Sequence, residues 1–222
     1  MKKGILIVIL VVLIVLVIVL PIKDIIIEPS IIGALFARVY VRPAWANYSC
    51  SATFLEGWNL ISTPCLASNT SVASVFSSIS GDYVSIHGYD PDDDSDPWKS
   101  YNPSLQSWVV HDLTEINEKK GYWINMKNQD TFYLNGTLRD PNSISLVSGW
   151  NLIGYPANTT KGVADALSSI GENYTTIWLY NATDSTYYYY DALAGDGTLG
   201  QMRPYYGYWV NMSISVSLVI TS

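Results

Sequence analysis

The chain has 222 residues, of which 49% are hydrophobic, 13% aromatic and 14% charged, and its formal net charge is −7 at pH 7. Residues 47–222 carry seven Lys or Arg against 17 Asp or Glu, so this part repels phosphate backbones, which excludes nucleic-acid binding. Zinc is not predicted, because the only two cysteines are expected to pair with each other and only two histidines are then left as ligands.

The chain begins with an unbroken apolar run at residues 4–20, behind Lys2 and Lys3. As a helix rising about 1.5 Å per residue, this run is about 25 Å long, near the lower limit for crossing a bilayer. A cleaved signal peptide is the alternative, but a small-x-small cleavage site does not follow promptly. We predict a transmembrane signal anchor at residues 1–22, with the N-terminus cytoplasmic and the remaining chain extracellular.

The next segment, residues 23–46, is apolar but broken by Pro29 and Pro43. Proline interrupts both helices and central strands, so we predict a connector near the membrane surface. An alternative is an extra strand at Ala34–Val41 that docks on a repeat unit.

An internal repeat organises the rest of the chain. The sequence GWNLI stands at residues 57–61 and again at residues 149–153, with a proline three residues further on in both places. The sequence GYWINM at residues 121–126 returns as GYWVNM at residues 207–212. These matches predict two copies of one unit, at residues 47–140 and 141–222.

Each copy is predicted to hold one short helix and several strands. Apolar residues at spacing i, i+3, i+4, i+7 follow both GWNLI motifs, and alternation at period two is clearest near the C-terminus. The predicted fold is mainly β, a β-rich α+β architecture of two tandem homologous units behind an N-terminal apolar transmembrane helix. Four tryptophans are predicted to anchor the cores, namely Trp58, Trp150, Trp123 and Trp209.

The repeat pattern of GWNLI, proline, short helix and GYW[I/V]NM resembles a repeat domain of many archaeal and some bacterial cell-surface proteins. Those proteins are often anchored, glycosylated and modular. The resemblance implies an extracellular location in the cell envelope, and it carries over no functional residues.

Two further features agree with an oxidising, extracellular environment. Cys50 and Cys65 flank the first GWNLI strand and are predicted to form a disulfide. Asn-x-Ser/Thr sequons are more frequent than chance would give, which predicts a glycoprotein. The predicted glycosylation sites are Asn47, Asn69, Asn135, Asn158, Asn173, Asn181 and Asn211.

An acidic stretch, YDPDDDSDPW, is the only predicted metal site. Ca²⁺ takes six to eight oxygen ligands, and alternating aspartates can supply several of them. The candidate calcium ligands are Asp90, Asp92, Asp94 and Asp96, and a solvated acidic loop is the alternative. No other cofactor is predicted, because the GDGTLG sequence at residues 195–200 is followed by Pro204 and cannot open a nucleotide-binding helix.

A run of four tyrosines is the candidate interface. Tyr187, Tyr188, Tyr189 and Tyr190 place rings on both faces of a presumed strand, so at least two are expected to be exposed or covered by a partner. Such rings either stack on sugars or fill an interface between units or subunits. No catalytic residues are predicted, because His87 and His111 are the only histidines and no nucleophile-elbow pattern occurs.

Together these features predict a membrane-anchored, glycosylated extracellular structural or adhesion protein of the cell envelope, without enzymatic activity. Its predicted partners are the membrane, other envelope proteins or copies of itself, and in one alternative glycans. A pilin-like filament subunit is the first alternative, because Met1–Gly4 followed by an apolar helix resembles a pilin leader. A carbohydrate-binding module is the second.

Overall fold

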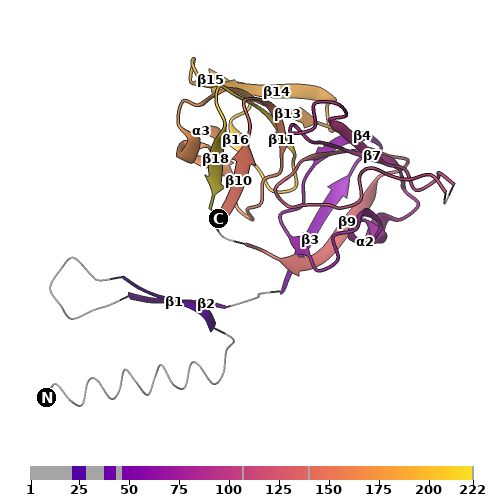
Figure 1. The fold of residues 1–222 in the computed structure, drawn as a ribbon, viewed down its shortest axis with the longest axis horizontal. Helices are drawn as coiled ribbons and strands as arrows, with labels where there is room; N and C mark the ends of the chain where they lie inside the picture. The colour runs from indigo at the N-terminus through magenta and orange to yellow at the C-terminus, as the bar shows by residue number, and fades with distance from the viewer. Residues whose placement is uncertain (1–21, 29–37, 44–46, 107, 140, 222) are drawn as a thin grey trace, which may run out of the picture. The chain divides into compact units, whose positions relative to one another are not determined.

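The computed structural model describes residues 22–28, 38–43, 47–106, 108–139 and 141–221, in two separate compact units at residues 1–46 and 47–222 (Figure 1). The predicted transmembrane anchor at residues 1–22 lies outside these ranges, except for Ile22. Within the described ranges, no helix is both long enough and apolar enough to cross a membrane.

The unit at residues 1–46 contains an antiparallel pair of strands, β1 (Ile22–Glu28) and β2 (Arg38–Pro43). The register places Ile25 opposite Val41 and Ile27 opposite Val39. The extra strand expected at Ala34–Val41 is therefore described only from Arg38, and it pairs with β1 of its own unit.

The unit at residues 47–222 is mainly β with antiparallel sheets, which confirms the predicted class of fold. The first copy contains β3 (Asn47–Phe54), β4 (Gly57–Ile61), β5 (Leu66–Ala67), α2 (Val72–Val75), η1 (Ser77–Ile79), β6 (Tyr83–Tyr89), β7 (Trp98–Tyr101), β8 (Tyr122–Met126) and β9 (Asp130–Thr137). Its sheets have the strand orders β3-β9-β5 and β4-β8-β6-β7.

The second copy repeats this order with small differences. It contains β10 (Asn142–Leu146), β11 (Gly149–Ile153), β12 (Lys161–Gly162), α3 (Val163–Ala166), η2 (Ser168–Ile170), β13 (Tyr174–Asn181), β14 (Thr186–Asp191), β15 (Asp196–Gly197), β16 (Gln201–Met202), β17 (Tyr208–Met212) and β18 (Val216–Ile220). Its sheets have the orders β10-β18, β12-β16 and β11-β17-β13-β14-β15. In Figure 1 the two copies lie side by side.

Each copy has its own apolar core between its two main sheets and its short helix. Along β8, Tyr122, Ile124 and Met126 are buried in the first core, while the residues between them face outward. The short helix contributes Val72 and Val75 to the same core, and Phe76, which follows it, joins them. Strand alternation thus gives each large sheet one buried face and one outer face.

The GWNLI motif turns the chain back between the first two strands of each copy. Gly57 has φ +86° and Gly149 has φ +93°, a left-handed conformation that glycine adopts without steric cost. The buried side chain of Asn59 accepts a hydrogen bond from Leu55 N and donates to Leu55 O and Gly57 O, at 2.7–3.0 Å. Asn151 makes the three equivalent bonds. The asparagine of the motif is therefore buried, and backbone groups of the turn form hydrogen bonds with its amide.

The copies meet through a pseudo-two-fold arrangement. Gly121 N donates to Leu152 O at 3.2 Å, and the equivalent Gly207 N donates to Leu60 O at 3.2 Å. A Cβ atom on Gly121 would lie 2.7 Å from a backbone oxygen of the other copy, and one on Gly207 would lie 2.8 Å from its counterpart. Leu60 and Leu152 are buried at this contact, outside both core clusters. This contact joins the copies into one unit.

The predicted disulfide is confirmed, and the second copy replaces it with a hydrogen bond. Cys50 on β3 is bonded to Cys65 just before β5, with Cα atoms 6.2 Å apart. Asn142 on β10 corresponds to Cys50, and its Nδ2 donates to Pro156 O at 2.9 Å. The same two segments are therefore linked covalently in one copy and by a buried amide in the other.

The prediction that four tryptophans anchor the cores is wrong. Trp58 is 44% exposed and Trp150 is 43% exposed, while Trp123 and Trp209 are half-buried. All four stand on the outer faces of the large sheets, because the turn holds Asn59 inward and strand alternation turns its neighbour Trp58 outward.

Candidate functional site

The outer faces of the two large sheets form one aromatic surface, which we call the aromatic face. Its members from the first copy are Trp58, His87, Tyr89, Trp98 and Trp123, and those from the second are Trp150, Trp178, Tyr180, Tyr187, Tyr189 and Trp209. Large exposed apolar surfaces of this kind mark binding or interaction sites.

Ring contacts between the copies make this face continuous. The ring centroids of Trp123 and Tyr180 are 5.2 Å apart, and those of the equivalent pair, Trp209 and Tyr89, are 5.0 Å apart. Both pairs connect one copy to the other. The pseudo-two-fold arrangement of the backbone therefore extends to the aromatic side chains.

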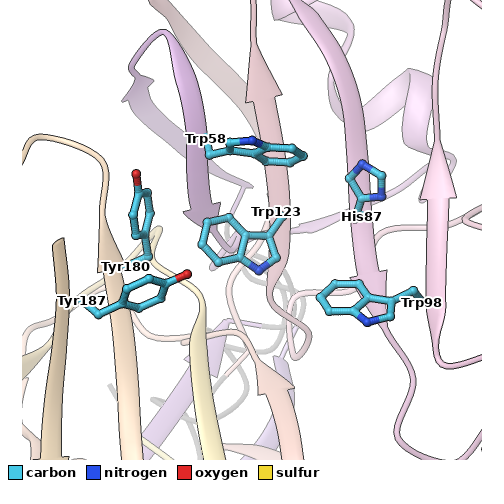
Figure 2. A pocket seen from close by; sticks show the side chains of 6 residues that line it. All are labelled: Trp58, His87, Trp98, Trp123, Tyr180 and Tyr187. Atoms are coloured by element: carbon cyan, nitrogen blue, oxygen red, sulfur yellow. The ribbon is translucent and has the colours of Figure 1, made fainter. Parts of the chain in front are cut away.

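The first hollow in the aromatic face has a volume of about 420 Å³ and is lined by Trp58, His87, Trp98, Trp123, Tyr180 and Tyr187. In Figure 2 the Trp123 ring lies at the centre of the view. The Trp58 ring lies above it, and His87 and Trp98 lie to its right. The rings of Trp58 and Trp123 are nearly perpendicular, at 87°. The hollow therefore has an aromatic floor and aromatic walls.

The second hollow has a volume of about 460 Å³ and is lined by Tyr89, Trp150, Trp178, Tyr187 and Trp209. Trp150 and Trp209 meet at 6.3 Å and 86°, close to the 6.2 Å and 87° of Trp58 and Trp123. The two hollows are thus near copies of one another. Both volumes fall within the range of about 300–1,000 Å³ typical of small-molecule sites.

The hollows differ in two of their lining residues, since Trp98 of the first corresponds to Tyr187 of the second and His87 corresponds to Trp178. The first has His87, whose Nε2 shares a 2.9 Å hydrogen bond with Ser85 Oγ. The second has Trp178 at the equivalent place, stacked on Tyr189 with centroids 5.1 Å apart. The Trp178 indole N–H is buried and has no hydrogen-bond partner among the described residues. A buried donor without an acceptor costs free energy unless a bound group accepts from it.

The electrostatics of the hollows favour uncharged ligands. No Lys, Arg, Asp or Glu is among the described residues that line either hollow. Burial lowers the pKa of His87 below its ordinary value of 6.5, and the nearby Asp112 carboxylate opposes this shift. His87 is therefore neutral at pH 7.

His87 does not form part of a catalytic triad in the described structure. The Asp112 carboxylate accepts hydrogen bonds from the backbone N–H and hydroxyl of Ser100, and no described carboxylate is hydrogen-bonded to His87. The other histidine, His111, contacts Tyr101 and accepts from Asn102 N. In the described structure both histidines therefore take part in ring contacts and hydrogen bonds.

The aromatic face also presents hydrogen-bonding groups along its strands. Asn125 lies opposite Trp58 and Ser85 in the sheet register, and Asn211 lies opposite Trp150 and Thr176. The Ser85 hydroxyl is bonded to His87 and the Thr176 hydroxyl donates to Tyr190 O, so the two asparagine amides are the groups that can fix the orientation of a ligand stacked on the rings.

The predicted calcium loop lies between β6 and β7 and is held by lysines. Asp93, which was not among the candidate ligands, accepts hydrogen bonds from Ser95 and from Lys99 Nζ, the latter at 2.7 Å. Lys99 holds the pKa of Asp93 well below its usual range, and Ser95 adds to this effect. Lys120 Nζ lies 3.6 Å from Asp90.

This loop does not collect the candidate ligands around one point. No three side chains of His, Cys, Asp or Glu in the described part of the chain are grouped to hold a metal ion. Calcium binding by Asp90, Asp92, Asp94 and Asp96 stays a prediction.

The tyrosine run divides between the two faces of β14. Tyr187 and Tyr189 are 51% and 39% exposed on the aromatic face, while Tyr188 and Tyr190 pack against the second core. Only two of the four therefore belong to the candidate site. The other members of the aromatic face were missed, although Trp and Asn alternate with buried residues in both GYW strands.

The predicted glycosylation sites have different environments. Asn69, Asn135 and Asn158 are exposed, Asn173, Asn181 and Asn211 are half-buried, and Asn47 begins β3. Among them Asn211 is on a strand of the aromatic face, and its neighbour in the sheet is Trp150.

Comparison of the chain with protein-family models, with curated proteins and with solved structures gives no match in any of the three. The functional reading therefore depends on the geometry of the aromatic face.

Proposed function

We propose that this protein is an adhesion protein of the cell envelope whose aromatic face binds neutral carbohydrate. The observation that carries the proposal is the pair of equivalent hollows, each lined by tryptophan and tyrosine rings and by no lysine, arginine or carboxylate among the described residues. The apolar C–H faces of a sugar ring stack on such side chains, while its hydroxyls remain available for polar groups.

Charge narrows the class of carbohydrate. Residues 47–222 carry an excess of ten acidic over basic residues, 17 against seven, so an anionic polysaccharide would be repelled. A flat, neutral sugar ring with equatorial hydroxyls exposes apolar hydrogens on both faces and suits perpendicular walls such as Trp58 and Trp123. Beta-linked glucose and N-acetylglucosamine polymers have this shape.

A quaternary ammonium group is the main competing ligand, because aromatic walls also attract cations. The amide of Asn125, which lies opposite Trp58 in the sheet, favours sugar, since a quaternary ammonium has no hydrogen-bond donor or acceptor to offer it. In this proposal the apolar residues 4–20 anchor the chain in the membrane, and the role of the chain is adhesive.

The test is depletion of the full chain from solution by insoluble cellulose and by insoluble chitin. The detergent must have no sugar headgroup, because such a headgroup would compete for the hollows. We expect retention that free cello- or chito-oligosaccharides reverse and that the Trp58→Ala/Trp150→Ala variant loses. Retention by neither polymer, or equal retention of the variant, would contradict carbohydrate binding.

The same experiment separates the competing functions. Release by choline instead of sugar would indicate a cation site. Concentration-dependent self-association that the double variant abolishes, without binding to either polymer, would indicate that the aromatic face joins copies of the chain in a filament or lattice.

A further inference from the structure

The two equivalent asparagines of the aromatic face differ in one chemical respect. Asn125 and Asn211 hold the same position beside the paired tryptophans, opposite Trp58 and Trp150. Asn211 is followed by Met and Ser213, which completes an Asn-x-Ser sequon, whereas Asn125 is followed by Met and Lys127. Only the second copy can therefore receive an N-linked glycan on this face.

We propose that Asn211 carries an N-linked glycan whose first sugars pack on Trp150 and fill the second hollow. The first hollow is then the one that binds carbohydrate from outside. The assignment of roles to the two hollows rests on the proposed function, whereas the modification and its packing do not.

The sheet geometry places such a glycan on the rings. Residues directly opposite in an antiparallel pair have Cβ atoms about 4.5–5.5 Å apart and point to the same face. Asn211 is opposite Trp150, and Trp209 lies two residues before it on the same face of β17. A sugar bonded to Asn211 Nδ2 therefore begins beside the Trp150 ring, at the rim of the second hollow.

Two groups at or beside the second hollow also favour an occupant. Asn211 is half-buried, and its amide makes no hydrogen bond with another described side chain. The Trp178 indole N–H is buried and unpaired within the described structure, whereas the equivalent His87 is satisfied by Ser85. A sugar hydroxyl that reaches this indole N–H would give it the acceptor that it lacks.

The modification is an ordinary group transfer. Asn211 Nδ2 loses a proton and forms a bond to the anomeric carbon of a lipid-phosphate-linked oligosaccharide. The bond between that carbon and the phosphate oxygen breaks, and the lipid phosphate leaves with the electron pair. The co-reactant is thus a lipid-linked sugar, and the new bond leaves the rest of the chain unchanged.

The first test is the mass of the peptide that contains Asn211, from full chain purified from its own membranes. We expect a glycopeptide, and Ser213→Ala should return this peptide to its unmodified mass. In the folded protein, Trp150→Ala should speed enzymatic release of the glycan by about tenfold, because the sugar loses its ring contact. Trp58→Ala is the matched control and should leave the release rate unchanged. An unmodified Asn211, or equal release rates in the two variants, would overturn the proposal.

The second test exchanges the sequon between the copies and uses chitohexaose and cellohexaose as ligands. Ser213→Ala should raise the stoichiometry from one site per chain to two. Lys127→Ser creates a sequon at Asn125 and should weaken binding by about tenfold or more, because both hollows are then covered. Unchanged stoichiometry in Ser213→Ala would overturn the division of roles. Absence of hexasaccharide binding in every variant, with the glycan still protected by Trp150, would instead contradict only the proposed function.

Discussion

In the first copy a disulfide joins Cys50 on β3 to Cys65, whereas in the second copy the same segments are joined by the hydrogen bond from Asn142 to Pro156. A similar exchange occurs on the aromatic face, where His87 in the first copy corresponds to Trp178 in the second. The backbone contacts between the copies are nearly identical. The comparison teaches that the shared residues build the scaffold, while differences in stability and binding arise at positions where the copies diverge.

The covalent link should have the largest effect on stability. We expect the Cys50→Ala/Cys65→Ala variant to lose about 3 kcal/mol of unfolding free energy, because the disulfide constrains a loop of about 15 residues in the unfolded chain. Asn142→Ala should lose about 1–2 kcal/mol, the cost of removing a buried hydrogen-bonding group. Denaturant unfolding measures both, and an equal loss in the two variants would contradict the difference between the links.

The contact between the copies should respond equally to equivalent changes. Gly121→Ala and Gly207→Ala each force a methyl group to within 2.7–2.8 Å of a carbonyl oxygen, and each should lower the unfolding free energy by about 2 kcal/mol. Gly200→Ala is the control, since no atom lies within 4 Å of its added methyl group. Thermal unfolding is sufficient to compare them, and a large effect in only one copy would break the pseudo-two-fold relation.

The smallest effect on the unfolding free energy is expected from lowering the pH. Burial lowers the pKa of His87 in the folded chain below 6.5, so the unfolded chain binds more protons as the pH falls from about 6.5 through the folded value. This contribution to stability is present above pH 6.5 and is lost across that window. His87→Trp makes the first hollow resemble the second and should remove this part of the pH dependence. Unfolding curves at pH 7 and pH 5 test it, and an unchanged slope would contradict the assignment.

The fold class was predictable because the internal repeat and the strand alternation follow from the local order of apolar and polar residues. The disulfide was predictable because Cys50 and Cys65 are the only cysteines and flank one strand. These inferences require no knowledge of which face of a strand is buried.

The aromatic face was not predicted because alternation separates two faces without saying which is inside. Trp58 is more apolar than Asn59, yet the turn satisfies the asparagine with three hydrogen bonds and leaves the tryptophan outside. A signal was present in the GYW strands, where Trp123 shares a face with Asn125. The role of Asp93 depends on Lys99 six residues later, a pairing that the sequence does not reveal.

The most direct test of the account is the affinity of the natively glycosylated full chain for chitohexaose and cellohexaose, compared between Trp58→Ala and Trp150→Ala. These side chains are equally exposed, at 44% and 43%, so neither substitution should disturb the fold. We predict that Trp58→Ala weakens binding by about tenfold or more, the effect of removing a central aromatic contact, and that Trp150→Ala leaves it nearly unchanged. Unchanged binding by Trp58→Ala would contradict the claim that the first hollow is the carbohydrate site.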